Sequence, residues 1–126
     1  MNSQILSQIG KLNNIYFRNS ETKLKDLKKK DVKIFYIAKK GKVVGYCILK
    51  WPAGCVNMEY IGVVKEYRKK HIGTKLVKKA IKWCARNGCP LFTYASIYNT
   101  VSINMLVKCG FLVEYCTTRW VFFRIG

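Results

Sequence analysis

Residues 58–74 read MEYIGVVKEYRKKHIGT and join a predicted strand to a predicted helix through a basic turn. The strand, over 56–64, is a mostly apolar run, whereas the helix, over 72–87, has apolar residues three or four positions apart. The first N–H groups of such a helix are free, its dipole end is positive, and Gly73 lets a phosphate come close. The turn matches neither the P-loop nor the dinucleotide-binding glycine pattern. It predicts an anion site of another kind, with an ordinary basic turn as the alternative.

The elements on either side of this segment alternate between helical and strand patterns. Lys40-Gly41 is typical of a hairpin turn, and Gly88 and Pro90 end the central helix. Helices are predicted at 4–18, 22–29, 72–87 and 99–109, and strands at 33–38, 43–50, 56–64, 91–97, 112–116 and 118–125. This order predicts one α/β domain over residues 1–126, with a mixed, mostly antiparallel sheet and helices on both faces.

Composition limits the classes of function. The 126 residues carry a net charge of +18, and residues 67–113 include no Asp or Glu. Such a field attracts phosphorylated cofactors, nucleic acid or acidic proteins, unless the lysines form only a solvated surface.

The six cysteines and one histidine are the residues from which a metal site or a disulfide framework would have to be built. The cysteines form no C-x-x-C pair, so no metal site is expected. Neither an export signal nor an apolar run of about 20 residues is recognised, so we expect a cytoplasmic protein with reduced thiols and no membrane association.

Two motifs identify a family resemblance that covers roughly residues 33–126. Residues 63–74, VVKEYRKKHIGT, closely resemble the acetyl-CoA signature of the GCN5-related N-acetyltransferases (GNAT), in which [RQ]-x-x-G-x-[GA] holds the cofactor pyrophosphate. Residues 99–111, NTVSINMLVKCGF, are similar to the later family motif N-x-x-A-x-x-x-Y-x-x-x-G-F. The two motifs stand in the family's order and on the expected elements. The resemblance therefore implies a GNAT-like fold that uses acetyl-CoA as cosubstrate and needs no metal.

The resemblance also implies which residues bind acetyl-CoA. The backbone of Ile61, Gly62 and Val63 would pair with the pantetheine amides, and Asn99 would reach the same arm. Lys108 would meet a cofactor phosphate, with a solvated helix lysine as an equal alternative. The pyrophosphate would be held, chiefly through backbone N–H groups, by Arg68, Lys69, Lys70, His71, Ile72, Gly73 and Thr74.

Two positions depart from the family pattern. His71 replaces the first glycine of the signature, and Leu106 replaces a tyrosine that often protonates the departing thiolate. Tyr94, Tyr98, Cys109 or solvent would have to supply that proton.

Glu59 is the candidate general base, because an attacking amine must lose a proton and many family members carry a base near this point. It stands alone in an apolar strand. An ion pair with a nearby Lys or Arg is the alternative role.

These features predict direct acetyl transfer from acetyl-CoA to a primary amine. The positive charge favours an acceptor on an anionic carrier, either a small molecule or a macromolecule, over a polycation. The alternative is a catalytically weakened GNAT-fold module that binds nucleic acid or an acidic protein through its basic surface. The chain would be a monomer or a homodimer, depending on whether the apolar stretch 120–123 lies at a sheet edge or in the core.

Overall fold

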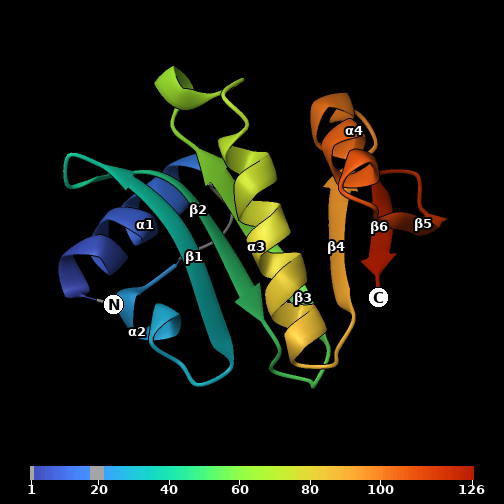
Figure 1. The fold of residues 1–126 in the computed structure, drawn as a ribbon, viewed down its shortest axis with the longest axis horizontal. Helices are drawn as coiled ribbons and strands as arrows, with labels where there is room; N and C mark the ends of the chain where they lie inside the picture. The colour runs from blue at the N-terminus through green and yellow to red at the C-terminus, as the bar shows by residue number, and fades with distance from the viewer. Residues whose placement is uncertain (1, 18–21) are drawn as a thin grey trace.

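A computed structural model describes residues 2–17 and 22–126 and has one six-stranded sheet with helices on both faces (Figure 1). The strand order is β1-β2-β3-β4-β6-β5. The elements are α1 (Ser3–Tyr16), α2 (Leu24–Leu27), β1 (Val32–Lys39), β2 (Lys42–Lys50), β3 (Val56–Val63), the 3₁₀ turn η1 (Lys65–Tyr67), α3 (Ile72–Arg86), β4 (Leu91–Ser96), α4 (Thr100–Lys108), β5 (Leu112–Cys116) and β6 (Trp120–Ile125).

Strands β1, β2 and β3 form an antiparallel half-sheet that is covered on both faces. Strand β2 is buried over nearly its whole length, as expected for a strand packed from both sides. Its alternate residues enter two different cores: Tyr46 and Ile48 pack under α1 and α2, whereas Cys47 and Leu49 pack under α3.

A buried hydrogen-bond chain fixes α1 to this half-sheet. The Tyr46 hydroxyl donates to Asn13 Oδ1 at 2.7 Å, and Asn13 Nδ2 donates to Thr22 Oγ1 at 2.7 Å. The Tyr46 ring lies directly against Gly62 of β3, so a Cβ at Gly62 would be 2.6 Å from the ring. Gly62 is therefore required by packing between strands.

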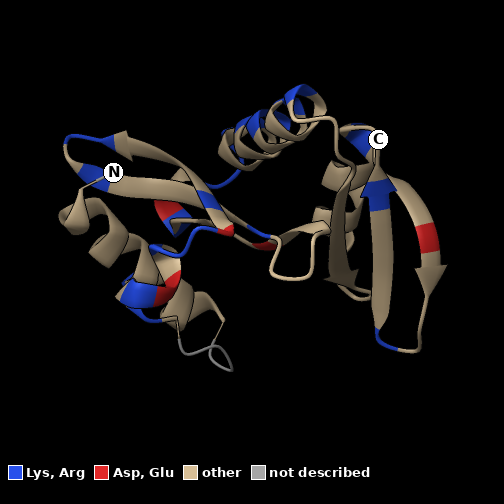
Figure 2. Cartoon of the chain, turned by 90° about the horizontal axis from the view of Figure 1, so that it is seen from below, with Lys and Arg blue, Asp and Glu red and all other residues tan. Residues whose placement is uncertain are grey.

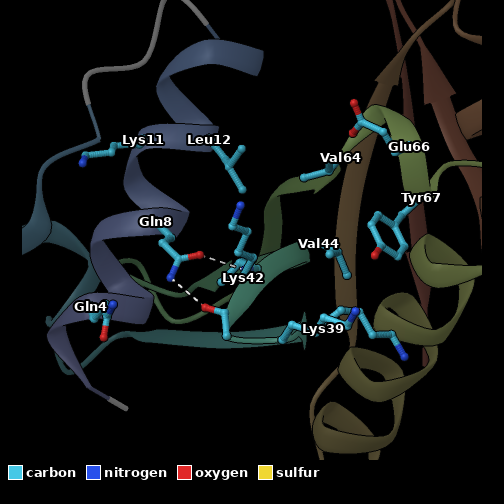
Figure 3. A pocket seen from close by; sticks show the side chains of 13 residues that line it. Gln4, Gln8, Lys11, Leu12, Lys39, Lys42, Val44, Val64, Glu66 and Tyr67 are labelled. Carbon is cyan, nitrogen blue, oxygen red and sulfur yellow. Dashed lines mark hydrogen bonds between the residues drawn. The ribbon is translucent and has the colours of Figure 1, made fainter.

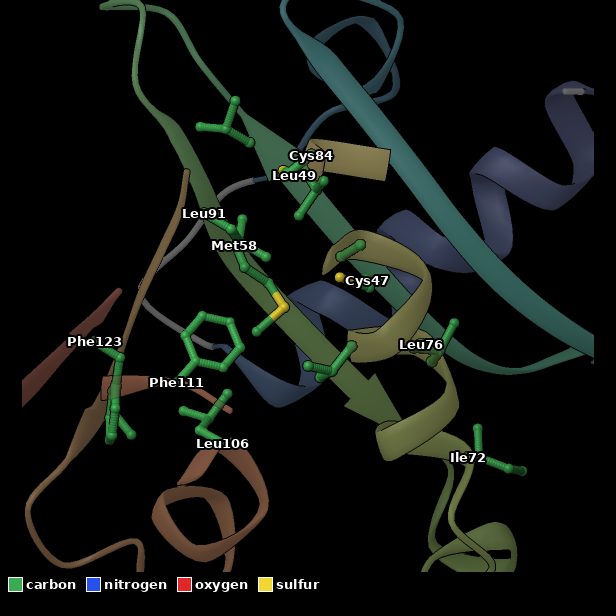
Figure 4. Close-up of a cluster of buried hydrophobic side chains, with 14 of the residues drawn as sticks. Cys47, Leu49, Met58, Ile72, Leu76, Cys84, Leu91, Leu106, Phe111 and Phe123 are labelled. Atoms are coloured by element: carbon green, nitrogen blue, oxygen red, sulfur yellow. The ribbon is translucent and has the colours of Figure 1, made fainter. Parts of the chain in front are cut away.

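The second half-sheet, β4-β6-β5, joins the first through a short parallel contact. Strands β3 and β4 pair only at Val56↔Leu91 and Asn57↔Phe92, whereas β4 pairs with β6, and β6 with β5, in antiparallel ladders. Helices α3 and α4 share one core across this junction, in which Leu76, Leu106 and Phe111 are buried (Figure 4). The predicted α/β class, mixed sheet and helices on both faces are confirmed.

The structure corrects two sequence expectations and decides one open alternative. The second helix is only α2, because Lys23 is extended and the run 28–30 adds like charges that oppose continuation. The last strand starts at Trp120, since Thr117 Oγ1 accepts the N–H groups of Arg119 and Trp120 in a tight turn. Of the two positions left open for 120–123, the structure excludes the sheet edge: β6 lies between β4 and β5, and β5 forms the edge. Arg18, the last residue of the first predicted helix, lies outside the described residues.

Candidate functional site

A groove of about 670 Å³ opens where β3 and β4 diverge, between the starts of α3 and α4. Its walls come from the end of β3, the turn before α3, the first turn of α3 and the first turns of α4. The lining residues are Tyr16, Ile61, Gly62, Val63, Tyr67, Arg68, Lys69, His71, Ile72, Gly73, Thr74, Asn99, Val101, Ser102 and Met105.

One side of the groove is a strand edge. Residues 61–63 of β3 pair with β2 at residues 45–47 but not with β4, because the pairing between β3 and β4 ends at Asn57. The Val63 carbonyl accepts a 2.9 Å hydrogen bond from Arg68 Nε, so Arg68 closes the turn onto the strand. The guanidinium of Arg68 also stands 5.4 Å from the centre of the Tyr16 ring. The remaining edge groups can pair with an extended, amide-bearing ligand as an added strand would.

The end of the groove is the N-terminus of α3. His71 is the N-cap in a left-handed conformation (φ 62°), and no side chain caps the helix. Lys69, two residues earlier, also has positive φ (64°). The free N–H groups of the first turn and the positive end of the helix dipole therefore face the groove, where an anion is stabilised.

The opposite wall is the start of α4. Asn99 caps this helix, because its side-chain oxygen accepts the Ser102 N–H at 3.1 Å. Val101, Ser102 and Met105 then face the groove. These three residues were not predicted from the sequence, although a helix starting at Asn99 places Val101 and Ser102 one turn before Met105 on the same side.

Ten of the twelve predicted cofactor residues come together in this groove, and Lys70 and Lys108 do not. The Lys70 ammonium stands 5.2 Å from the Tyr67 ring centre, and Lys108 is in the exposed last turn of α4. Tyr16 and Tyr67 were also missed. Tyr16 comes from α1, far away in the sequence, so no local pattern could have placed it there.

A second hollow, of about 1000 Å³, lies between α1, the β1–β2 hairpin and η1 (Figure 3). Gln8 fixes the hairpin to α1, since its Nε2 donates to the Gly41 carbonyl and its Oε1 accepts the Val43 N–H. Lys11, Lys39, Lys40 and Lys42 line the hollow, and Glu66 is the carboxylate among its lining residues. It includes none of the predicted site residues, so the groove beside α3 is the better candidate.

Comparison with known proteins decides the family. The model of the acetyltransferase (GNAT) family matches residues 7–111, which include the groove and both motifs. The chain belongs to the GNAT family. The GNAT signature therefore lies in the turn that the structure places at the anion end of the groove.

Solved structures share the GNAT fold at low sequence identity. The structure of yncA from Salmonella typhimurium with acetyl-CoA has a TM-score of 0.84 and 15% identity, covering 100% of this chain and 90% of that one. The ribosomal-protein-S18-alanine N-acetyltransferase of Escherichia coli has a TM-score of 0.82 and 17% identity, covering 99% of this chain and 89% of that one. The paia N-acetyltransferase of Thermoplasma acidophilum in complex with coenzyme A has a TM-score of 0.76 and 16% identity, covering 98% of this chain and 94% of that one. No curated protein sequence matches the chain.

Glu59 occupies an irregular point of β3 in this GNAT fold. The register against β2 shifts between Met58 and Tyr60, so Glu59 is the extra, bulged residue. It is half-buried, and within residues 2–17 and 22–126 no Lys, Arg or His lies within 4.0 Å of its carboxylate. The alternative role of Glu59 in an ion pair therefore finds no partner in the described part of the chain.

The position of the usual GNAT tyrosine offers no proton donor. Leu106 is buried between α4 and the sheet, next to Phe111. Burial raises the pKa of the Cys109 thiol, and the Tyr98 side chain is exposed. Burial, with the nearby charge of Glu59, also raises the pKa of Tyr94, so its phenol keeps its proton at neutral pH. Of the three side chains considered, Tyr94 is the one beside Glu59.

In the described ranges no three His, Cys, Asp or Glu side chains are grouped to hold a metal ion. None of the helices described there combines the length and the apolar content that a bilayer crossing demands. All six cysteines are free thiols.

His71→Gly is expected to raise the free energy of unfolding by about 0.5–1 kcal/mol. Glycine adopts the left-handed conformation without the steric cost that histidine has there, and the greater entropy of glycine in the unfolded chain offsets part of this stabilisation. Chemical denaturation measures this change. Lys70→Gly is the matched control, since Lys70 is not in the left-handed region and its substitution should only destabilise. Equal destabilisation by both substitutions would show that the His71 backbone carries no strain.

Proposed function

We propose that this GNAT-family chain is an N-acetyltransferase that transfers the acetyl group of acetyl-CoA directly to a primary amine. One observation carries the proposal: a single groove combines the free edge of β3 with the uncapped N-terminus of α3. The amides of pantetheine can form hydrogen bonds with the strand edge, and the negative charge of the pyrophosphate is stabilised at the helix N-terminus. The GNAT structures solved with acetyl-CoA or coenzyme A support this cosubstrate.

The roles of the residues follow from their positions. The edge at 61–63 and the N–H groups of Ile72, Gly73 and Thr74 hold and orient acetyl-CoA, and Asn99 orders the α4 wall. Glu59 takes the proton that the amine loses as its nitrogen bonds to the acetyl carbon. The carbon–sulfur bond then breaks, and the departing thiolate takes a proton from solvent or from Tyr94. No acyl-enzyme is formed.

The surface charge supports an acceptor on an anionic carrier. Lys75, Lys78, Lys79 and Lys82 are exposed on α3, and basic residues far outnumber acidic ones over the molecule (Figure 2). A positive field raises the encounter rate with anions and slows that with polycations.

The test compares the peptides Ala-Asp-Asp and Ala-Arg-Arg, which present the same N-terminal amine, by release of free coenzyme A. We expect kcat/KM to be about tenfold higher for the acidic peptide at low salt, with the difference shrinking as salt screens the charges. Equal rates at low salt would overturn the anionic acceptor. Absence of thiol release with every amine of a broad panel would contradict acetyl transfer.

A second candidate function rests on Leu106, which removes the usual proton donor. A weakened GNAT module that binds nucleic acid through the exposed lysines of α3 would bind RNA with steep salt dependence. RNA binding that is absent, or independent of salt, would dismiss this candidate.

A further inference from the structure

Within residues 2–17 and 22–126, no helix lies over one face of the β4-β6-β5 half-sheet. Along β4, Leu91, Thr93 and Ala95 point into the core beneath α3 and α4, so Phe92 and Tyr94 point to the opposite face. Helices α1 and α2, which lie on that opposite side, contribute their buried residues only to the core under β1–β3 (Figure 1). The described elements therefore leave the outer face of β4-β6-β5 open.

Aromatic rings cover this open face in contact with one another. Tyr94 meets Trp120 edge-on with centroids 5.4 Å apart, and lies 6.0 Å from Phe122. Tyr115 stacks on Phe122 at 4.5 Å with 14° between the planes. Tyr94, Trp120 and Tyr115 keep 39%, 41% and 56% of their surface exposed. Contiguous exposed aromatic surface of this kind marks a binding site more often than a solvated surface.

The aromatic face begins beside Glu59. The Thr93 hydroxyl donates to the Met58 carbonyl at 3.0 Å, which locks β4 against β3 immediately before Tyr94 and Glu59. The charge of Glu59 contributes to the raised pKa of Tyr94, as expected for close neighbours. Tyr94 therefore lies near the proposed base, at the start of the aromatic face.

The charge of the chain selects between two occupants of this face. A second copy would bring a further +18 against the first, and this repulsion opposes self-association. A small aromatic amine carries at most one positive charge, so the field of the chain opposes it far less, and its ring can stack on Trp and Tyr. A protonated amine near Glu59 would in addition be attracted by the aromatic faces.

We infer that the acceptor carries its amine on a flat aromatic group, which stacks on Trp120 and Tyr94 while its nitrogen reaches Glu59. This inference rests on the proposed acetyl transfer and names the acceptor class for the same site. Trp120 and Tyr94 are then specificity-determining residues of the acceptor side.

The test compares tryptamine with butylamine, two monocationic primary amines, by steady-state release of coenzyme A. We expect kcat/KM to be about tenfold higher for tryptamine, because its ring can stack on Trp120 and Tyr94 whereas butylamine has no ring. Trp120→Ala should raise KM for tryptamine more than KM for butylamine and so remove most of the preference. Trp120→Phe should retain it, which separates ring stacking from a loss of folding.

Three results would overturn the inference. Equal turnover of the two amines by the wild-type protein would remove the aromatic preference while leaving acetyl transfer intact. If neither amine is turned over, calorimetry measures the binding of tryptamine to the coenzyme A complexes of the wild-type and Trp120→Ala proteins. Absence of binding to the wild-type complex, or binding that Trp120→Ala does not abolish, would contradict the inference. Sedimentation that shows a wild-type dimer, converted to a monomer by Trp120→Ala, would assign the face to a second copy.

Discussion

Glu59→Gln is expected to lower kcat by about 10²–10³-fold and to leave acetyl-CoA affinity unchanged. The amide cannot accept the proton of the attacking amine, and a positioned general base commonly contributes about 10²–10⁴-fold. Glu59 lies at the bulge of β3, outside the cofactor groove, so the substitution should not alter that groove. Steady-state release of coenzyme A measures kcat, and the thermal shift with acetyl-CoA measures binding.

Glu66→Gln is the matched control for this experiment. It removes the same charge from an exposed carboxylate in η1, which lines the other hollow, and activity should stay within twofold of wild type. Retained activity in Glu59→Gln would show that solvent takes the proton and that Glu59 is not the base.

Gly62→Ala is expected to lower the free energy of unfolding by about 2–3 kcal/mol, in the range of overpacked core substitutions. The new Cβ would lie 2.6 Å from the Tyr46 ring. The ring cannot retreat freely, because its hydroxyl donates to the buried Asn13 side chain. Urea denaturation measures the change.

Gly10→Ala provides a control of opposite sign. Gly10 lies inside α1, where a Cβ would have its nearest contact at 3.8 Å from Leu27 Cδ1. Alanine there fits and has the better helix propensity, so the protein should gain up to about 1 kcal/mol. A Gly62→Ala protein as stable as wild type would show that the contact with Tyr46 is not tight in solution.

The parts of the fold that depend on local pattern could be predicted from the sequence. The periodicity over 72–87 and the turn residues Lys40-Gly41 correspond to α3 and to the β1–β2 hairpin. The motif turn could be placed at the start of α3 because glycine and basic residues there have a local physical meaning. The ten groove residues named in advance belong to these two motifs and the adjoining strand.

The remaining features depend on contacts between distant segments. Alternation along β4 and β6 shows two faces, but it does not tell which face a helix covers. The position of Tyr94, Trp120 and Tyr115 on the open face could therefore not be predicted. The strand order that places β6 between β4 and β5 is equally absent from local pattern.

The position of the cofactor is the central claim, and thermal unfolding with acetyl-CoA tests it most directly. Acetyl-CoA at about 100 times its dissociation constant should stabilise the protein by about 2.7 kcal/mol, a shift of several degrees. Val101→Glu, which adds a negative charge to the groove wall, should reduce the shift, whereas Val107→Glu, on the same helix outside the groove, should not. A shift that Val101→Glu weakens and Val107→Glu preserves is the predicted result. Absence of any shift, or equal shifts in both variants, would contradict acetyl-CoA binding in this groove.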